Sequence, residues 1–218
     1  YVASVMGALH LALPTESVAR LVGAAPAEAV GDAATQATLT GFFERATGAA
    51  MRDAGTAFDI GATNIQEYLA QHGDTVFEGI AAEERAGAVP HLMRAQRLFN
   101  VSADPASFQT LLTSGLGSAR EIASMPLATF MDRFAPDLGE QQTMLMHSRA
   151  MGITTSSLEI YTTLHDALYG LFPNAVHVGE ADPREGMQQV VGKHIPNWRE
   201  LFGAPELWWA AAVPALLF

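Results

Sequence analysis

The chain has 218 residues, which is long enough for one or two domains with a buried core. Hydrophobic residues make up 49% of it and charged residues only 16%, so we expect part of its surface to be covered by a partner or by further chain. The formal net charge of −11 disfavours non-specific binding to nucleic acid, and the absence of cysteine excludes disulfides, thiolate nucleophiles and cysteine-ligated metal sites.

Helix start and stop signals dominate the sequence, and runs of alternating β-branched residues are few. The pattern predicts an all-α fold, an irregular bundle or array of short helices with one long helix over about 140–171. The first expected helices are one capped by Thr15, one over about 33–54, and one that starts at Thr63 or Asn64 and ends at Gly73.

Proline and glycine mark the helices that follow. Pro90 is expected to open or kink a helix whose solvated face carries Arg94 and Arg97. Asp104 followed by Pro105 is typical of an N-cap with proline at the first helical position. The remaining expected starts are Ser118 behind two glycines, Pro126, and the long helix after Gly139.

Three segments follow from this punctuation. Residues 1–56 form an N-terminal helical segment, 57–172 a helical core that contains the glycine motif, and 173–218 a linker plus a C-terminal segment anchored by aromatic residues. The chain begins with Tyr1 rather than Met, so we expect either a fragment of a longer chain or a processed or trimmed start.

The last run, Leu207–Phe218, is apolar and contains Pro214. It is shorter than the roughly 20 residues that a transmembrane helix needs, so no transmembrane segment is predicted in this stretch. We expect the run to dock against protein, either in self-assembly or on the rest of a larger chain.

The stretch TLLTSGLGSAREIASM, Thr110–Met125, allows two interpretations. Its Gly115-Leu116-Gly117 resembles the hairpin of helix-hairpin-helix DNA-binding modules, and a helix N-terminus attracts phosphate. Phosphate binding would need cations nearby, yet residues 104–133 contain two basic and three acidic side chains. We therefore interpret the stretch as a tight corner between two helices and predict no nucleic-acid binding.

Two histidines share a seam on the long helix. His147, Tyr161 and His165 fall at alternating steps of three and four residues, together with Met151, Thr154, Leu158, Leu168 and Phe172. A core or interface role is the usual one for such histidines. The alternative is a stand-alone all-α enzyme or a cofactor-binding protein, such as a haem protein, with His147, Tyr161, His165 and Asp166 lining a pocket.

The other histidines are scattered, and no HExxH, paired His-x-His, nucleophile-elbow, Walker or dinucleotide motif occurs. The sequence therefore predicts no metal and no cofactor. It does not decide whether the protein is an enzyme, although the missing motifs favour a protein without catalytic activity.

From about Phe58 onward, the order of motifs resembles the N-terminal α-helical region of the insecticidal Tc toxin A component, also described as the Salmonella virulence plasmid A-protein family. The matching pieces are FDIGATNIQEYLAQHG, RAQRLF at 94–99, LLTSGLGSAREIA with MPLATF behind it, and IPNWRELFG near the end.

This resemblance implies a helical outer-shell region of a very large, secreted, pentameric subunit that forms pores and translocates cargo. It implies scaffolding and delivery without a catalytic site, and it carries no functional residue across. The expected function is accordingly a non-catalytic helical scaffold or interaction region of a Tc-toxin-like protein.

Overall fold

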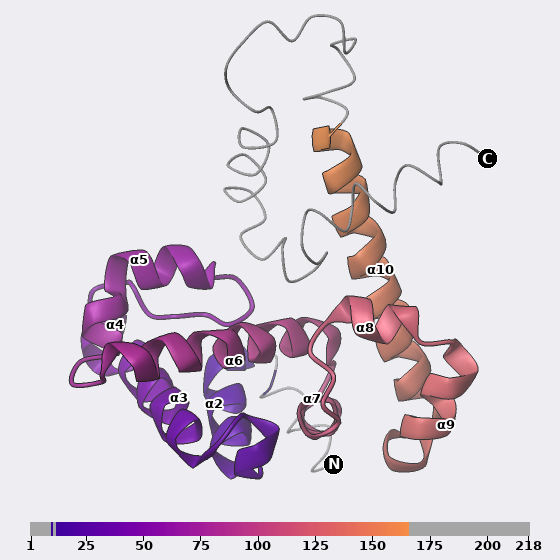
Figure 1. Ribbon diagram of the computed structural model, residues 1–218, viewed down its shortest axis with the longest axis horizontal. Helices are drawn as coiled ribbons and strands as arrows, with labels where there is room; N and C mark the ends of the chain where they lie inside the picture. The colour runs from indigo at the N-terminus through magenta and orange to yellow at the C-terminus, as the bar shows by residue number, and fades with distance from the viewer. Residues whose placement is uncertain (1–9, 11, 166–218) are drawn as a thin grey trace, which may run out of the picture. The chain divides into compact units, whose positions relative to one another are not determined.

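The computed structural model describes residues 10 and 12–165 of the chain (Figure 1). These residues form α-helices and one 3₁₀ turn and contain no strand, which confirms the all-α prediction for this part of the chain. The chain divides into two compact units, one ending at Met151 and the other beginning at Gly152. Residues on both sides of position 56 thus belong to the first unit, while the expected segment 173–218, with Leu207–Phe218, lies outside the described residues.

Local capping explains where the first helices begin. Asp32 accepts a hydrogen bond from the Thr35 N–H at 2.7 Å, and the Asn64 side chain accepts from the N–H groups of Gln66 and Glu67. The predicted start at Asn64 is therefore confirmed. The elements of this half are α2 (Pro14–Ala24), η1 (Ala27–Ala29), α3 (Ala33–Ala46), α4 (Ala49–Asp53) and α5 (Ile65–Val76).

The second half confirms three more predicted starts. Asp104 and Ser118 cap their helices through side-chain oxygens, and Gly139, at a φ of +82°, separates the last two. The elements are α6 (Ala82–Val101), α7 (Pro105–Thr113), α8 (Ala119–Ser124), α9 (Leu127–Leu138) and α10 (Glu140–His165). Residues 166–171 of the expected long helix lie outside the described part.

Some expected boundaries were wrong. The helix expected over 33–54 is two helices, because Gly48 is extended and the Ala46 carbonyl accepts from the Phe58 N–H instead of continuing the helix. Thr15 is not a cap. It lies inside α2, and its hydroxyl donates to the Phe58 carbonyl and accepts from the Ile60 N–H. The loop that follows α4 is thus tied to α2.

Pro90 was expected to open or to kink a helix, and only the first of these is wrong: α6 begins earlier, at Ala82, and runs through this proline. A proline inside a helix removes one hydrogen bond and costs about 3 kcal/mol. The fully buried Ala88 and Leu92 lie on either side of it, so packing of this helix face offsets the cost.

The interior of the first unit is built around α3 and α6. Helix α3 packs against α2, α5 and α6, and α6 crosses this unit with α7 against its C-terminal half (Figure 1). The Phe42 ring lies 5.3–6.4 Å from four other aromatic rings. The largest fully buried side chains include Phe42, Phe43, Phe108, Phe130, Leu92, Leu98, Leu111 and Ile122.

Within the described residues, no helix has the length and apolar character needed to cross a membrane.

Candidate functional site

The glycine motif forms a corner between α7 and α8. Gly115 has a φ of +83°, and the Ser118 hydroxyl caps α8 by accepting from the Glu121 N–H at 3.2 Å. The Glu121 carboxylate accepts in turn from the Gly117 N–H at 2.9 Å. This carboxylate occupies the helix end that a phosphate would need, so the geometry agrees with the corner interpretation.

Arg94 of α6 inserts its guanidinium beside this corner. Its Nε donates to the Leu116 carbonyl at 3.0 Å and its Nη2 to the Leu112 carbonyl at 2.9 Å. Its Nη1 donates to the Ala29 carbonyl of η1 at 2.6 Å. The side chain is half-buried, and this burial lowers the pKa of Arg94, while the Glu121 carboxylate opposes the shift. One cation therefore holds three separate segments together.

Two more arginines bind carbonyl oxygens of the same corner. Arg97 donates from Nε to the Gly117 carbonyl at 2.9 Å, and Arg133 of α9 donates from Nη2 to the Ser114 carbonyl at 2.8 Å. A row of carbonyl oxygens attracts cations and repels anions. The corner is thus built to be held by arginines of the protein itself.

The prediction that Arg94 and Arg97 form a solvated face was wrong. Both are half-buried, and the carbonyls that Arg94 binds lie 18, 22 and 65 residues away in the chain. Helical periodicity reports only neighbours on the same helix and cannot show such partners. The one sequence feature that could have indicated burial of Arg94 is its position between the apolar residues Met93 and Ala95, both of which are buried.

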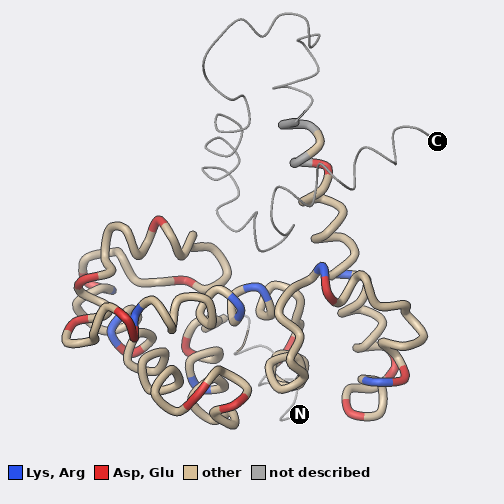
Figure 2. Tube along the Cα trace, viewed as in Figure 1, with Lys and Arg blue, Asp and Glu red and all other residues tan. Residues whose placement is uncertain are grey.

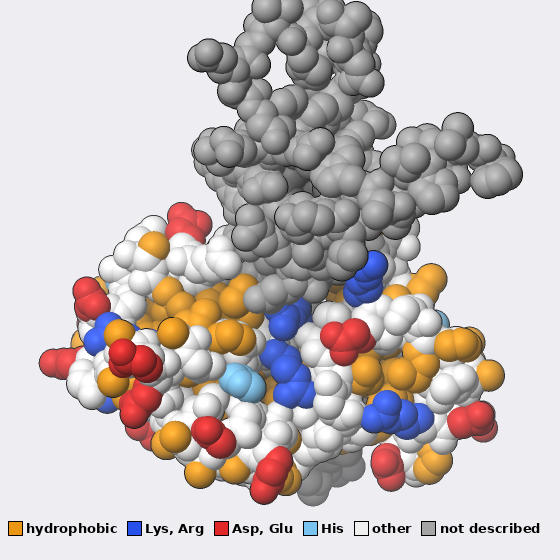
Figure 3. Space-filling model, viewed as in Figure 1, with side chains coloured by type: hydrophobic (Ala, Val, Ile, Leu, Met, Phe, Trp, Pro, Cys, Tyr) orange, Lys and Arg blue, Asp and Glu red, His pale blue; other side chains and the backbone are white. Residues whose placement is uncertain are grey.

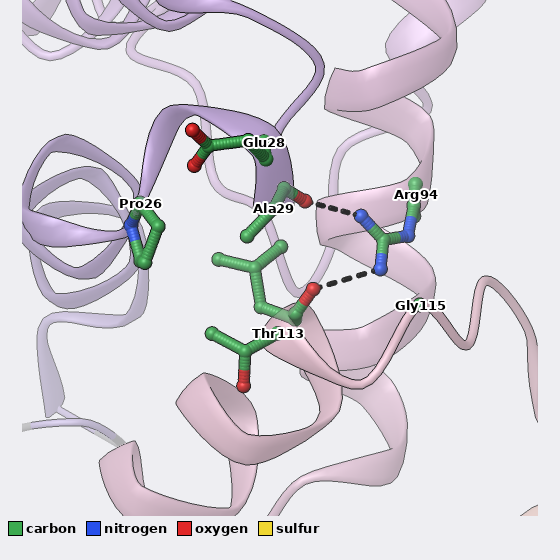
Figure 4. Close-up of a pocket in the computed structure, with 7 residues that line it drawn as sticks. Pro26, Glu28, Ala29, Arg94, Thr113 and Gly115 are labelled. Atoms are coloured by element: carbon green, nitrogen blue, oxygen red, sulfur yellow. Dashed lines mark hydrogen bonds between the residues drawn. The ribbon is translucent and has the colours of Figure 1, made fainter.

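A surface pocket of about 290 Å³ opens beside Arg94, between η1 and the C-terminal end of α7 (Figure 4). Figure 4 shows the guanidinium bonded to the Ala29 and Leu112 carbonyls, with Glu28 and Thr113 among the other lining residues. The carboxylate of Glu28 in the lining and the carbonyls around the cation both disfavour a bound anion. The pocket is lined by Pro26, Glu28, Ala29, Arg94, Leu112, Thr113 and Gly115.

His147, the first candidate residue of the alternative function, has a structural contact. Its Nε2 donates to the carbonyl of Met125 at 2.9 Å, and its ring lies 5.4 Å from the Phe130 ring. Met125 ends α8, so the imidazole satisfies a free carbonyl at a helix terminus. An Nε2 that carries this proton cannot also bind a metal.

The structure does not describe the side chains of the other candidate residues. Tyr161 and His165 belong to α10, although the structure describes only their backbone, and Asp166 lies outside the described residues. Two members of the expected seam, Met151 and Leu158, are 45% and 46% exposed. The helix instead buries a neighbouring face, formed by Thr143, Met146 and Ala150.

Two other histidines have distinct surroundings. His10 is fully buried, its Nδ1 is 2.8 Å from the Ser17 hydroxyl, and its Nε2 has no hydrogen-bond partner in the described structure. His91 is half-buried and lies close to Gly31. In the described part of the chain, no three potential metal ligands gather in one place.

Acidification should destabilise the protein through these two histidines. Burial lowers the pKa of both below the ordinary 6.5, with Asp104 opposing at His10 and Asp32 opposing at His91. Below pH 6.5 the unfolded chain therefore binds protons that the folded chain does not, and the free energy of unfolding decreases as pH falls. We expect Tm to be lower at about pH 5.5 than at about pH 7.5. His10→Gln with His91→Gln should reduce the difference, and a higher Tm at the lower pH would contradict the burial of both rings.

Gly115→Ala tests the corner itself. A Cβ at this position would meet no atom within 4 Å, so the expected cost comes from the positive φ alone, about 1–2 kcal/mol. Gly115→Asn should cost less, because asparagine tolerates this conformation better. Urea denaturation would measure both variants. Equal stability of the alanine variant and the native protein would show that the turn does not need glycine.

Comparisons of the chain with protein-family models, with curated proteins and with solved structures find no significant match to any of them.

Proposed function

We propose that this chain is a non-catalytic helical scaffold and interaction region of a Tc-toxin-like, secreted protein that forms pores or translocates cargo. One observation carries the proposal: the polar residues of the motifs that resemble that family hold the fold together. In RAQRLF, Arg94 and Arg97 bind corner carbonyls, and Gln96 donates to the carbonyls of Ile60 and Thr63 at 2.8 Å each.

The polar groups of the glycine corner are also bonded within the fold. Its carbonyls accept from three arginines and its amide N–H groups are capped by Ser118 and Glu121, so its polar groups serve architecture. A scaffold needs rigid joints between short helices, and this network supplies one.

Apolar side chains on α9 and α10 support an interaction role. Leu127, Met144, Leu145 and Met151 are each more than 40% exposed, and the fold of the first unit does not bury them. Apolar surface of this kind is typical of a region that meets other protein. The Leu207–Phe218 run is a second proposed contact for self-assembly or for the rest of a larger chain.

The alternative, an enzyme or haem protein based on the His147–His165 seam, receives no support from the described contacts. His147 uses Nε2 for the Met125 carbonyl, and neither described pocket is lined by α10. An absorption spectrum and metal analysis of the purified protein test it directly. A Soret band or a stoichiometric metal would favour the alternative over the scaffold.

The proposed function is tested by locating the native polypeptide. An antibody raised against residues 12–151 should detect, in extracellular fractions of the native source, a polypeptide much larger than 23.2 kDa. A 23.2 kDa product confined to the cells would contradict both the toxin-like context and the secretion. Blotting of a denaturing gel separates the two outcomes.

A further inference from the structure

Helices α5 and α6 enclose a groove of about 300 Å³. Its lining contains none of the three arginines that bind the glycine corner. The groove is floored by apolar and small side chains. Phe77 is buried beneath it, and Leu69 and Val89 are half-buried at its sides. On the face shown in Figure 3, hydrophobic side chains gather between α5 and α6. The complete lining is Leu69, Ala70, Gln71, Gly73, Asp74, Phe77, Arg85, Ala86 and Val89.

Small residues leave the groove open to a close partner. Ala70 and Ala86 are exposed, and a Cβ added at Gly73 would meet only the Leu69 Cβ, at 4.0 Å. A helix with larger apolar side chains can pack its ridge into such a channel. Shape and composition thus suit a peptide helix that presents an apolar face.

The surroundings of the groove are acidic. Residues 65–89 contain five acidic side chains and one arginine. That arginine, Arg85, is already bonded to Asp74 at 3.0 Å and to the Ile80 carbonyl at 2.8 Å. Glu67 stands two turns before Asp74 on α5, and Glu83 one turn before Ala86 on α6. Acidic residues are frequent along this part of the chain in Figure 2 and border the hydrophobic area in Figure 3.

From this pairing of apolar floor and acidic border, we propose that the α5–α6 groove docks an amphipathic helix of a partner protein whose apolar stripe is flanked by lysine or arginine. Apolar contacts supply affinity, and the acidic border attracts the basic flanks and orients the helix. A second copy of this chain is disfavoured, because two chains with a net charge of −11 each repel one another. The inference rests on the proposed interaction role and names a partner chemistry for it.

The test uses a fluorescent 16-residue helical peptide with a leucine stripe flanked by lysines, titrated with the purified chain. We expect saturable binding in the range of about 1–100 μM that weakens with added salt. The same leucine stripe flanked by glutamates should bind at least about tenfold more weakly. A lysine peptide with serines in place of the leucines should likewise lose about tenfold or more.

Variants locate the site. Ala86→Arg fills the groove and repels the peptide, and should weaken binding about tenfold or more. Glu67→Gln with Glu83→Gln should weaken it about three- to tenfold at low salt and less at high salt. Asp137→Asn on α9 removes one charge away from the groove and is the matched control, expected to leave binding unchanged. Circular dichroism checks that each variant is folded.

Three results would overturn the inference: no binding of the lysine peptide, equal binding of the glutamate peptide, or unchanged binding by Ala86→Arg. Light scattering that shows the chain dimerising through this groove would assign it to a second copy instead. The outcome is independent of the mass and location of the native polypeptide. A negative titration therefore removes the groove proposal alone, and a small cell-bound polypeptide removes the toxin-like context alone.

Discussion

Replacing Arg94 with alanine should lower the free energy of unfolding by about 2–4 kcal/mol, among the largest effects of any single polar substitution in the described chain. The guanidinium donates three hydrogen bonds, to the carbonyls of Ala29, Leu112 and Leu116. Without it, three half-buried carbonyls lose a charged donor and the contact between η1, α7 and the corner is released.

Arg94→Lys should recover less than half of this loss, because one ammonium group cannot reach three carbonyls in the fork geometry of a guanidinium. Arg20→Ala is the matched control. Arg20 is exposed on α2, and the described structure gives it no hydrogen bond or ion pair, so we expect a change below about 0.5 kcal/mol. Denaturant titration measures all three variants. An Arg94→Ala protein as stable as the Arg20→Ala protein would show that the three hydrogen bonds of Arg94 contribute nothing to the free energy of unfolding.

Phe42→Ala should cost about 3–5 kcal/mol. Phe42 is fully buried in α3, and its ring contacts the rings of Phe43, Phe58, Tyr68 and Phe77. Removal of the ring leaves a cavity where α3, α5 and the intervening loop meet, and this packed interior can collapse only in part. Thermal unfolding followed by circular dichroism should show a much lower Tm than for the native protein.

Tyr68→Phe is the control within the same cluster. The Tyr68 hydroxyl is buried and has no hydrogen-bond partner among the described residues, and this burial raises the pKa of the phenol. Its removal keeps the ring and relieves an unpaired polar atom, so we expect unchanged or slightly higher stability. A loss near that of Phe42→Ala would show that this hydroxyl is bonded in solution and that the cluster is arranged differently.

Features that depend on a few neighbouring residues were predictable from the sequence. The starts at Asn64, Asp104 and Ser118 follow from side chains that accept from N–H groups two or three residues ahead. The inward position of Phe130 and Phe134 follows from helical spacing alone. Each of these features depends on residues close together in the sequence, and the tertiary structure does not change it.

Features that depend on distant partners were not predictable. Arg94 looked solvated because its carbonyl partners belong to η1, α7 and the corner. The sequence placed His147 on a seam with Met151, yet the helix buries the neighbouring face that contains Met146 and Ala150. The His147 imidazole instead donates to the Met125 carbonyl at the end of α8. The helix expected over 33–54 breaks at Gly48 because a loop residue, Phe58, takes the carbonyl of Ala46. In all three cases tertiary contacts decide the outcome.

The central proposal is that this chain serves as a scaffold within a larger assembly, and the mass of the native particle that contains it tests that proposal most directly. Particles captured from the native source with an antibody against residues 12–151 can be weighed by mass photometry without denaturation. The proposal predicts an oligomer whose mass is several times that of its own polypeptide. A monodisperse monomer of 23.2 kDa would contradict it.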